Sequence, residues 1–230
     1  MAANVQIIGV GLYTVPQASR LTGVSQPRIR RWLRGYEYER QRRRSGPIWH
    51  SQLSPIDDVL ALGFLDLMEI RFVDAFLEAG LSLKKIRRAA QLATELVGTD
   101  HPFSTRKFHT DGKRVFAEIE NEDPSGKALY DLEGRQFGIY DVILPSLIEG
   151  VEFGEDGQAI SWQPNPSTPL VIIDPRRQFG QPIIRDAGLQ TAVLADAVRA
   201  EGSVDAVASY YEVQPEAVKQ AVKFEFKKAA

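Results

Sequence analysis

The chain has 230 residues, of which 43% are hydrophobic and 25% are charged. That length can bury a hydrophobic core and suggests one or two domains. The absence of cysteine excludes a disulfide framework and a thiolate metal site. No apolar run approaches the roughly 20 residues of a membrane span, and the N-terminus lacks the pattern of a secretion signal. We therefore expect a cytoplasmic protein.

The net charge of −2 is unevenly distributed along the chain. Residues 11–50 contain nine arginines and two glutamates, a balance of +7, so the rest of the chain carries −9. A basic N-terminal part on an acidic body predicts that the first part binds nucleic acid and that the remainder has a different partner.

Residues 13–33 have the pattern of a helix-turn-helix. Thr14 and Gln17 form a capping box at the start of the first helix. Gly23 ends that helix, and Ser25 can cap a second one. Apolar residues at helical spacing predict a buried face on the first helix, formed by Val15, Ala18 and Leu21.

The second helix is apolar on one side and basic on the other. At 100° per residue, its apolar side consists of Ile29, Trp32 and Leu33. Arg31 and Arg34 fall opposite, with Arg28 and Arg30 on the flanks. Arginines on a major-groove helix bind phosphates and donate to guanine edges, whereas the alternative is a solvated charged face. We expect DNA contacts from Ser25, Gln26, Arg28, Arg30, Arg31, Arg34, Arg40, Arg42, Arg43 and Arg44, with Arg28 and Arg31 nearest to the base edges.

Residues 36–51 predict a β-hairpin wing with the arginine-rich segment 40–46 at its tip. The outgoing strand would contain Tyr36 and Tyr38, and the returning strand Ile48 and Trp49. The tip arginines are suited to phosphates or to a minor groove. Two helices with apolar faces are expected next, over 64–79 and 83–97.

The order of these features resembles the winged-helix DNA-binding domain of MerR-type regulators. The resemblance covers residues 13–97 and rests on YTVPQASRLTGVSQPRIRRW followed by FLDLMEIRFVDAFLEAGLSLKKIRRA. The second stretch carries a Gly-x-Ser-Leu-x-x-Ile pattern at Gly80, Ser82, Leu83 and Ile86. MerR proteins continue into a long dimerising helix and an effector module, often with ligand cysteines, whereas this chain has Pro102, strand patterns and no cysteine.

The middle of the chain changes to a period of two. Phe108, Asp111-Gly112 and the alternating residues Val115, Ala117 and Ile119 predict a β-hairpin. A second hairpin is expected over 151–162, after a short helix within 140–148. The proline-rich stretch 162–169 predicts a linker, and 170–173 a short strand. Three further helices, over 192–200, 204–211 and 216–226, predict a trihelix that is similar to a helix-turn-helix.

The C-terminal segment 174–226 resembles a small trihelical family first named only as a domain of unknown function. The pattern comprises Gly180, Pro182 and Ile184, then Glu201-Gly202-Ser203, then Val207 and Tyr211. Family members often have Gly-Thr-Arg where this chain has Asp186-Ala187-Gly188. The family includes antitoxins beside PIN-like ribonuclease toxins, and the whole order resembles the long VapB-type antitoxins of actinobacteria and proteobacteria. The resemblance implies operator binding and neutralisation of a cognate toxin.

The sequence offers little for catalysis. His50, His101 and His109 have no metal-ligand spacing, and the chain contains neither a nucleophile elbow nor a P-loop. We expect a non-enzyme without cofactor or metal. The alternative to the antitoxin is a stand-alone regulator with a small-molecule pocket in the central region, motivated by Phe103, Phe108, Phe116 and Trp162.

We therefore expect a mainly α fold with β elements (α+β) in three parts. Residues 1–98 would form a MerR-like winged-helix DNA-binding domain, and 99–169 a β-rich central segment and linker. Residues 170–230 would form a trihelical antitoxin or dimerisation domain. The expected partners are operator DNA, a PIN-like toxin and a second copy of the chain in a homodimer.

Overall fold

The computed structural model describes residues 8–38, 43–112, 115, 144–145 and 147–226, and it confirms the mixed α+β class. Helices dominate, and the strands form small antiparallel pairs. The helices are α1 (Val15–Thr22), α2 (Gln26–Arg34), α3 (Phe64–Glu78), α4 (Leu83–Val97), α7 (Thr191–Glu201), α8 (Val204–Tyr210) and α9 (Pro215–Phe226). The strands are β1 (Tyr36–Tyr38), β2 (Arg43–Ser45), β3 (Val151–Phe153), β4 (Ala159–Trp162), β5 (Val171–Ile172) and β6 (Ile183–Ile184), and 3-10 turns occur at η1 (Pro102–Ser104) and η2 (Gln178–Gly180).

Helices α1 and α2 form the predicted helix-turn-helix. The capping box is present, because the Thr14 side chain accepts a hydrogen bond from the Gln17 backbone and Gln17 Oε1 accepts one from Thr14 N at 2.8 Å. Gly23 ends α1 with a φ of 79°. Ser25 occupies the N-cap position of α2, but its side chain makes no capping hydrogen bond. The predicted apolar faces of both helices are buried.

The wing is shorter than the sequence suggested. β1 pairs with β2 in a register that places Tyr36 opposite Ser45 and Tyr38 opposite Arg43. The prediction that Ile48 and Trp49 form the returning strand was wrong, because β2 ends at Ser45 and these two residues lie outside any strand, with their side chains buried in the core. Ile48 instead donates its backbone N–H to the carbonyl of Trp32, which ties the segment after the wing to α2.

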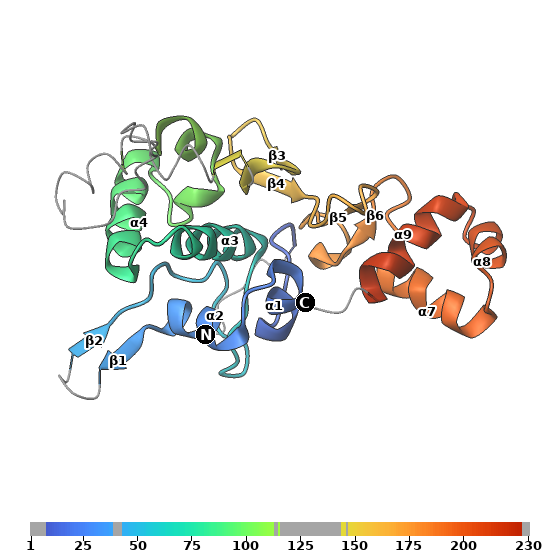
Figure 1. Ribbon diagram of the computed structural model, residues 1–230, viewed down its shortest axis with the longest axis horizontal. Helices are drawn as coiled ribbons and strands as arrows, with labels where there is room; N and C mark the ends of the chain where they lie inside the picture. Colours follow the sequence, from blue (N-terminus) through green and yellow to red (C-terminus); the bar gives the residue numbers. More distant parts are fainter. Residues whose placement is uncertain (1–7, 39–42, 113–114, 116–143, 146, 227–230) are drawn as a thin grey trace, which may run out of the picture.

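Helix α3 lies at the centre of the N-terminal part, with α1 and α2 on one side and α4 next to it (Figure 1). The hydrophobic core of this N-terminal part combines residues of α1 to α4 with aromatic residues from later in the chain, among them Phe103, Phe108 and Trp162. The first predicted hairpin of the central region was wrong, because residues 106–112 are helical and place Phe108 at a buried position. Its remaining residues 116–119 lie outside the described part of the chain.

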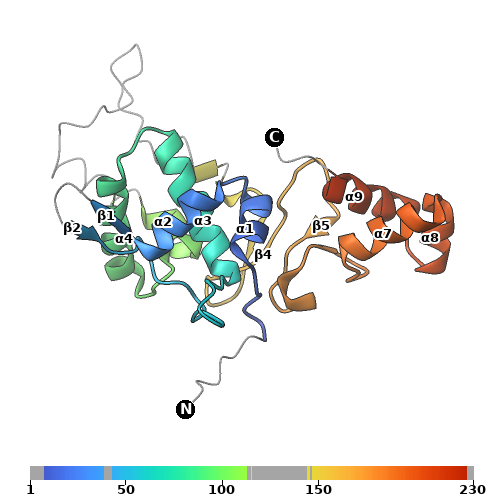
Figure 2. The same ribbon diagram turned by 90° about the horizontal axis from the view of Figure 1, so that it is seen from below.

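The second predicted hairpin and the C-terminal trihelix are present. β3 pairs with β4, and β5 pairs with β6. Helices α7, α8 and α9, which we call the trihelix, surround a separate small core that contains Val171, Leu194, Val207 and Val218. The trihelix lies at one end of the molecule and the wing at the opposite end, with α1 on the side that faces the trihelix (Figures 1 and 2).

Candidate nucleic-acid interface

The arginines of α2 lie on its outer face. Ile29, Trp32 and Leu33 are buried, and the helix therefore turns its opposite side outward. Arg30, Arg31 and Arg34 are exposed there, and Arg30 Nη2 donates to Gln26 Oε1 at 3.2 Å. The helix contains no acidic residue. It presents a cationic surface of the kind that binds a phosphate backbone.

Arg28 is engaged by the body of the protein. Its Nη2 atom lies 2.8 Å from Asp74 Oδ1 of α3 as an ion pair, although the N–H is not aligned for a hydrogen bond. Its guanidinium also lies 5.2 Å from the Trp32 ring centroid. Burial raises the pKa of Asp74, with Arg28 opposing that rise and Glu78 adding to it. In this arrangement Arg28 fixes α2 against α3.

The structure places only part of the arginine-rich wing. Arg43 and Arg44 belong to β2 rather than to the tip, and Arg40 and Arg42 lie outside the described residues. The base of the wing is fastened to α4, because Arg87 Nη1 donates to the carbonyl oxygens of Gly46 and Pro47. Gly35, at the start of the wing, has a φ of 80°, and a Cβ there would overlap the Ser45 carbonyl oxygen.

Asp66 is a buried polar centre that sequence reasoning missed. This carboxylate is fully buried and accepts hydrogen bonds from Trp49 Nε1 at 2.8 Å and from Gly63 N at 2.7 Å. It also accepts from Ser51 Oγ and from Gln52 N. Asp66 and Glu69 share a face of α3 with buried apolar residues, and acidic residues within an apolar stripe are the signal that could have revealed them.

Two more buried groups adjoin Asp66. His101 Nε2 lies 3.2 Å from Asp66 Oδ1. Glu69 Oε1 accepts from Ser104 N at 3.2 Å, while Glu69 Oε2 has no hydrogen-bond partner among the described residues. Burial, reinforced by the Asp66 charge, raises the pKa of Glu69 well above its ordinary value, against the hydrogen bonds from Ser104 and Phe103. This cluster joins α3 to the segment after the wing and to η1.

The histidines are scattered. His50 is exposed, whereas His109 lies in the helical segment 106–112 and not in the predicted strand. Burial and the nearby Arg71 charge lower the pKa of His109 to about 4, so its ring is neutral at neutral pH. Within the described residues, no cluster of histidines and carboxylates could hold a metal ion. None of the described helices is long and apolar enough to span a bilayer.

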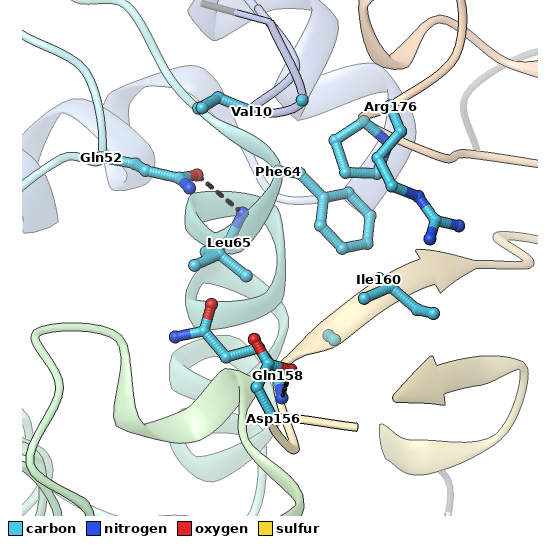
Figure 3. A pocket seen from close by; sticks show the side chains of 11 residues that line it. Val10, Gln52, Phe64, Leu65, Asp156, Gln158, Ile160 and Arg176 are labelled. Atoms are coloured by element: carbon cyan, nitrogen blue, oxygen red, sulfur yellow. Dashed lines mark hydrogen bonds between the residues drawn. The ribbon is translucent and has the colours of Figure 1, made fainter. Parts of the chain in front are cut away.

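A half-open pocket of about 120 Å³ lies beside the N-terminus of α3 (Figure 3). Phe64 and Ile160 contribute apolar walls, and Arg176 and Gln158 contribute polar groups. Gln52 also lines it but is occupied, because its Oε1 accepts from Leu65 N at 3.1 Å. The aromatic residues expected around an effector do not line this pocket. Phe103, Phe108 and Trp162 are buried in the core, and Phe116 lies outside the described residues.

Two family models match parts of the chain. Residues 11–90 match a family described as "Putative DNA-binding HTH domain", and this range spans α1, α2, the wing, α3 and the first half of α4. Residues 171–224 match "Protein of unknown function (DUF433)", which spans β5, β6 and nearly all of the trihelix.

The chain is also similar as a whole to mycobacterial proteins. It is 28% identical over 223 residues to the protein called "Putative antitoxin VapB45" of Mycobacterium tuberculosis, covering 93% of each chain. Its fold matches the crystal structure of Rv2018 from Mycobacterium tuberculosis with a TM-score of 0.72 at 24% identity. That match covers 94% of this chain and 98% of the other. The order of an N-terminal helix-turn-helix and a C-terminal trihelix thus recurs in a solved structure.

Proposed function

We propose that this protein is the antitoxin of a type II toxin–antitoxin system. It binds a PIN-like ribonuclease toxin directly and represses its own operon by binding operator DNA. The observation that carries the DNA half is the exposed arginine face of α2 within a helix-turn-helix. The similarity to a protein called an antitoxin over 93% of both chains supports the toxin half.

Helix α2 and the wing would read the operator as in a MerR-like winged helix. Arg30, Arg31 and Arg34 face outward, so they contact phosphates and base edges when α2 enters a major groove. Arg28, already paired with Asp74, would fix the angle of α2. The wing arginines would hold phosphates or enter the adjoining minor groove. A homodimer would place two α2 helices on half-sites about 34–36 Å apart.

The toxin-binding surface is proposed to lie on the trihelix. The segment 200–218 contains four acidic residues and no basic residue. These are Glu201, Asp205, Glu212 and Glu216, all exposed. Tyr210, in the same segment, is 81% exposed. An exposed aromatic side chain in a segment whose charges are all negative suits a basic protein surface such as an RNA-binding site.

Co-purification tests the antitoxin claim. The chain is co-expressed with the product of the adjacent reading frame, and the two proteins are expected to elute as one complex. Charge reversal at Glu201, Asp205 and Glu212 should weaken the complex, whereas charge reversal at Glu95 of α4, also exposed, should not. Failure of the wild-type pair to co-elute would contradict the antitoxin claim and leave DNA binding to be judged separately.

A second candidate is a regulator that responds to a small molecule. The pocket beside α3 supports it, because Phe64 of α3, Ile160 of β4 and Arg176 line the same small space. A ligand there would bridge the helix-turn-helix part and the central hairpin. Thermal-shift screening against metabolites separates the two functions, since the antitoxin is expected to be stabilised by its protein partner and by no metabolite.

A further inference from the structure

Helix α1 is held at both of its ends by residues from the C-terminal part of the chain. Before its first turn, Tyr13 Oη donates to the Gly180 carbonyl at 2.7 Å. Leu12 N donates to the Phe179 carbonyl at 3.1 Å. In its last turn, Arg20 Nη1 lies 2.8 Å from Glu225 Oε2 of α9. We call these three contacts the α1 clamp.

The first end of the clamp depends on an unusual turn. Gln178, Phe179 and Gly180 have φ values of 49°, 53° and 79°, so three consecutive residues adopt the left-handed region. A Cβ at position 180 would overlap the Tyr13 hydroxyl. Tyr13 is 1% exposed, and burial raises its pKa, which keeps the hydroxyl protonated as a donor. Left-handed non-glycine residues are costly and persist where surrounding contacts impose them. Here those contacts come from the residues just before α1.

The second end of the clamp joins three helices. The Glu225 carboxylate, whose side chain is 14% exposed, accepts from Thr191 Oγ1 at the start of α7 as well as from Arg20. Phe224 packs against both hydrophobic cores, and the Arg20 guanidinium lies 5.9 Å from its ring centroid. Because the Glu225 side chain is mostly buried, water screens this ion pair less than it screens an ordinary surface pair.

Helix α1 packs on α2 and therefore sets the direction in which the arginine face of α2 points. We propose that the α1 clamp positions the helix-turn-helix for operator binding, with Gly180 and Glu225 as positioning residues that do not touch DNA themselves. This inference rests on the DNA half of the proposed function and is independent of the toxin. Under this proposal the trihelix helps to orient the helix-turn-helix on DNA, rather than acting as an independent domain joined by a linker.

The decisive variants change Glu225 in the full-length chain. Glu225→Gln removes the charge of the partner, and Glu225→Arg replaces attraction by repulsion while adding a cation. Both should weaken binding to a duplex from the region upstream of this gene by about fivefold, the effect of a pair worth about 1 kcal/mol. Binding to an unrelated duplex should be unchanged or, for Glu225→Arg, stronger. The positive charge added by Glu225→Arg would by itself attract any duplex. A loss of specific affinity in this variant therefore cannot come from direct attraction or repulsion between position 225 and the DNA.

Charge exchange provides the rescue. Arg20→Glu alone should also weaken specific binding, and Arg20→Glu combined with Glu225→Arg should recover most of it because the pair is re-formed in reverse. The melting midpoint of each variant is compared with that of Glu95→Gln, an exposed site outside the clamp. Wild-type affinity in both Glu225 variants would overturn the proposal.

Hydrogen exchange tests the clamp without relying on DNA. The Leu12 amide and the amides of α2 should exchange faster in Glu225→Gln and in Gly180→Ala than in the wild type. If wild-type protein fails to bind the upstream duplex but the amides of α2 lose protection in the variants, the DNA half of the proposed function fails and the clamp stands. If α2 protection is unchanged in both variants, the positioning claim is wrong.

Discussion

Removing the Asp66 carboxylate should be among the most destabilising single changes in the protein. Asp66→Ala leaves Trp49 Nε1 and Gly63 N without their acceptor inside the core, and both bonds are buried. Each stranded buried donor costs about 1–3 kcal/mol, and this change strands at least these two. We therefore expect a loss of about 3–5 kcal/mol in the free energy of unfolding.

Urea unfolding measures this loss, with Asp100→Ala as the control because Asp100 is exposed. The control should stay within about 0.5 kcal/mol of the wild type. Because the bonds of Asp66 hold the segment that follows the wing, the variant should also bind DNA less tightly. A loss below about 1 kcal/mol would mean that water or rearranged neighbours replace the carboxylate, and the account of Asp66 as the polar centre of the core would be refuted.

Three further outcomes follow from the described contacts. Burial raises the pKa of Glu69 above its ordinary 4.5, so above that pH the folded state retains a proton that the unfolded state releases, and the free energy of unfolding should fall as the pH rises. Glu69→Gln should flatten this decline in urea unfolding measured at a series of pH values above 4.5. Gly180→Ala should lower the melting midpoint and weaken operator binding together, since the added methyl group overlaps Tyr13. Asp74→Asn should lower the free energy of unfolding by about 1 kcal/mol or less, because the partner Arg28 is 41% exposed. The same variant should lose more free energy of operator binding than of unfolding, because Arg28 then no longer fixes α2 against α3.

The helix-turn-helix and the trihelix could be predicted from the sequence because their information is local. Thr14, Gly23 and Ser203 mark helix ends, and apolar spacing marks the faces that are buried. The position of α2's apolar side followed from Ile29, Trp32 and Leu33 alone. The placement of the arginines on the outer face is a direct consequence of that geometry.

The contacts that span the chain could not be predicted. Phe108 before Asp111-Gly112 has the pattern of a hairpin, yet packing of Phe108 with Phe103 and Phe72 favours a helix at 106–112. The pairing of Arg28 with Asp74 depends on how α2 lies against α3. The Arg20–Glu225 pair joins residues 205 positions apart, and nothing in the local pattern around either residue indicates the other.

The arginine face of α2 is tested most directly by the salt dependence of operator binding. The affinity of the full-length chain for the upstream duplex is measured over a series of salt concentrations for wild type, Arg31→Ala/Arg34→Ala and Arg199→Ala, an exposed arginine on α7. Each phosphate contact contributes about 0.9 to the log–log slope. We expect the α2 double variant to lose affinity and to have a slope smaller by about 2, with Arg199→Ala unchanged. An unchanged slope in the α2 variant would contradict the claim that α2 faces DNA.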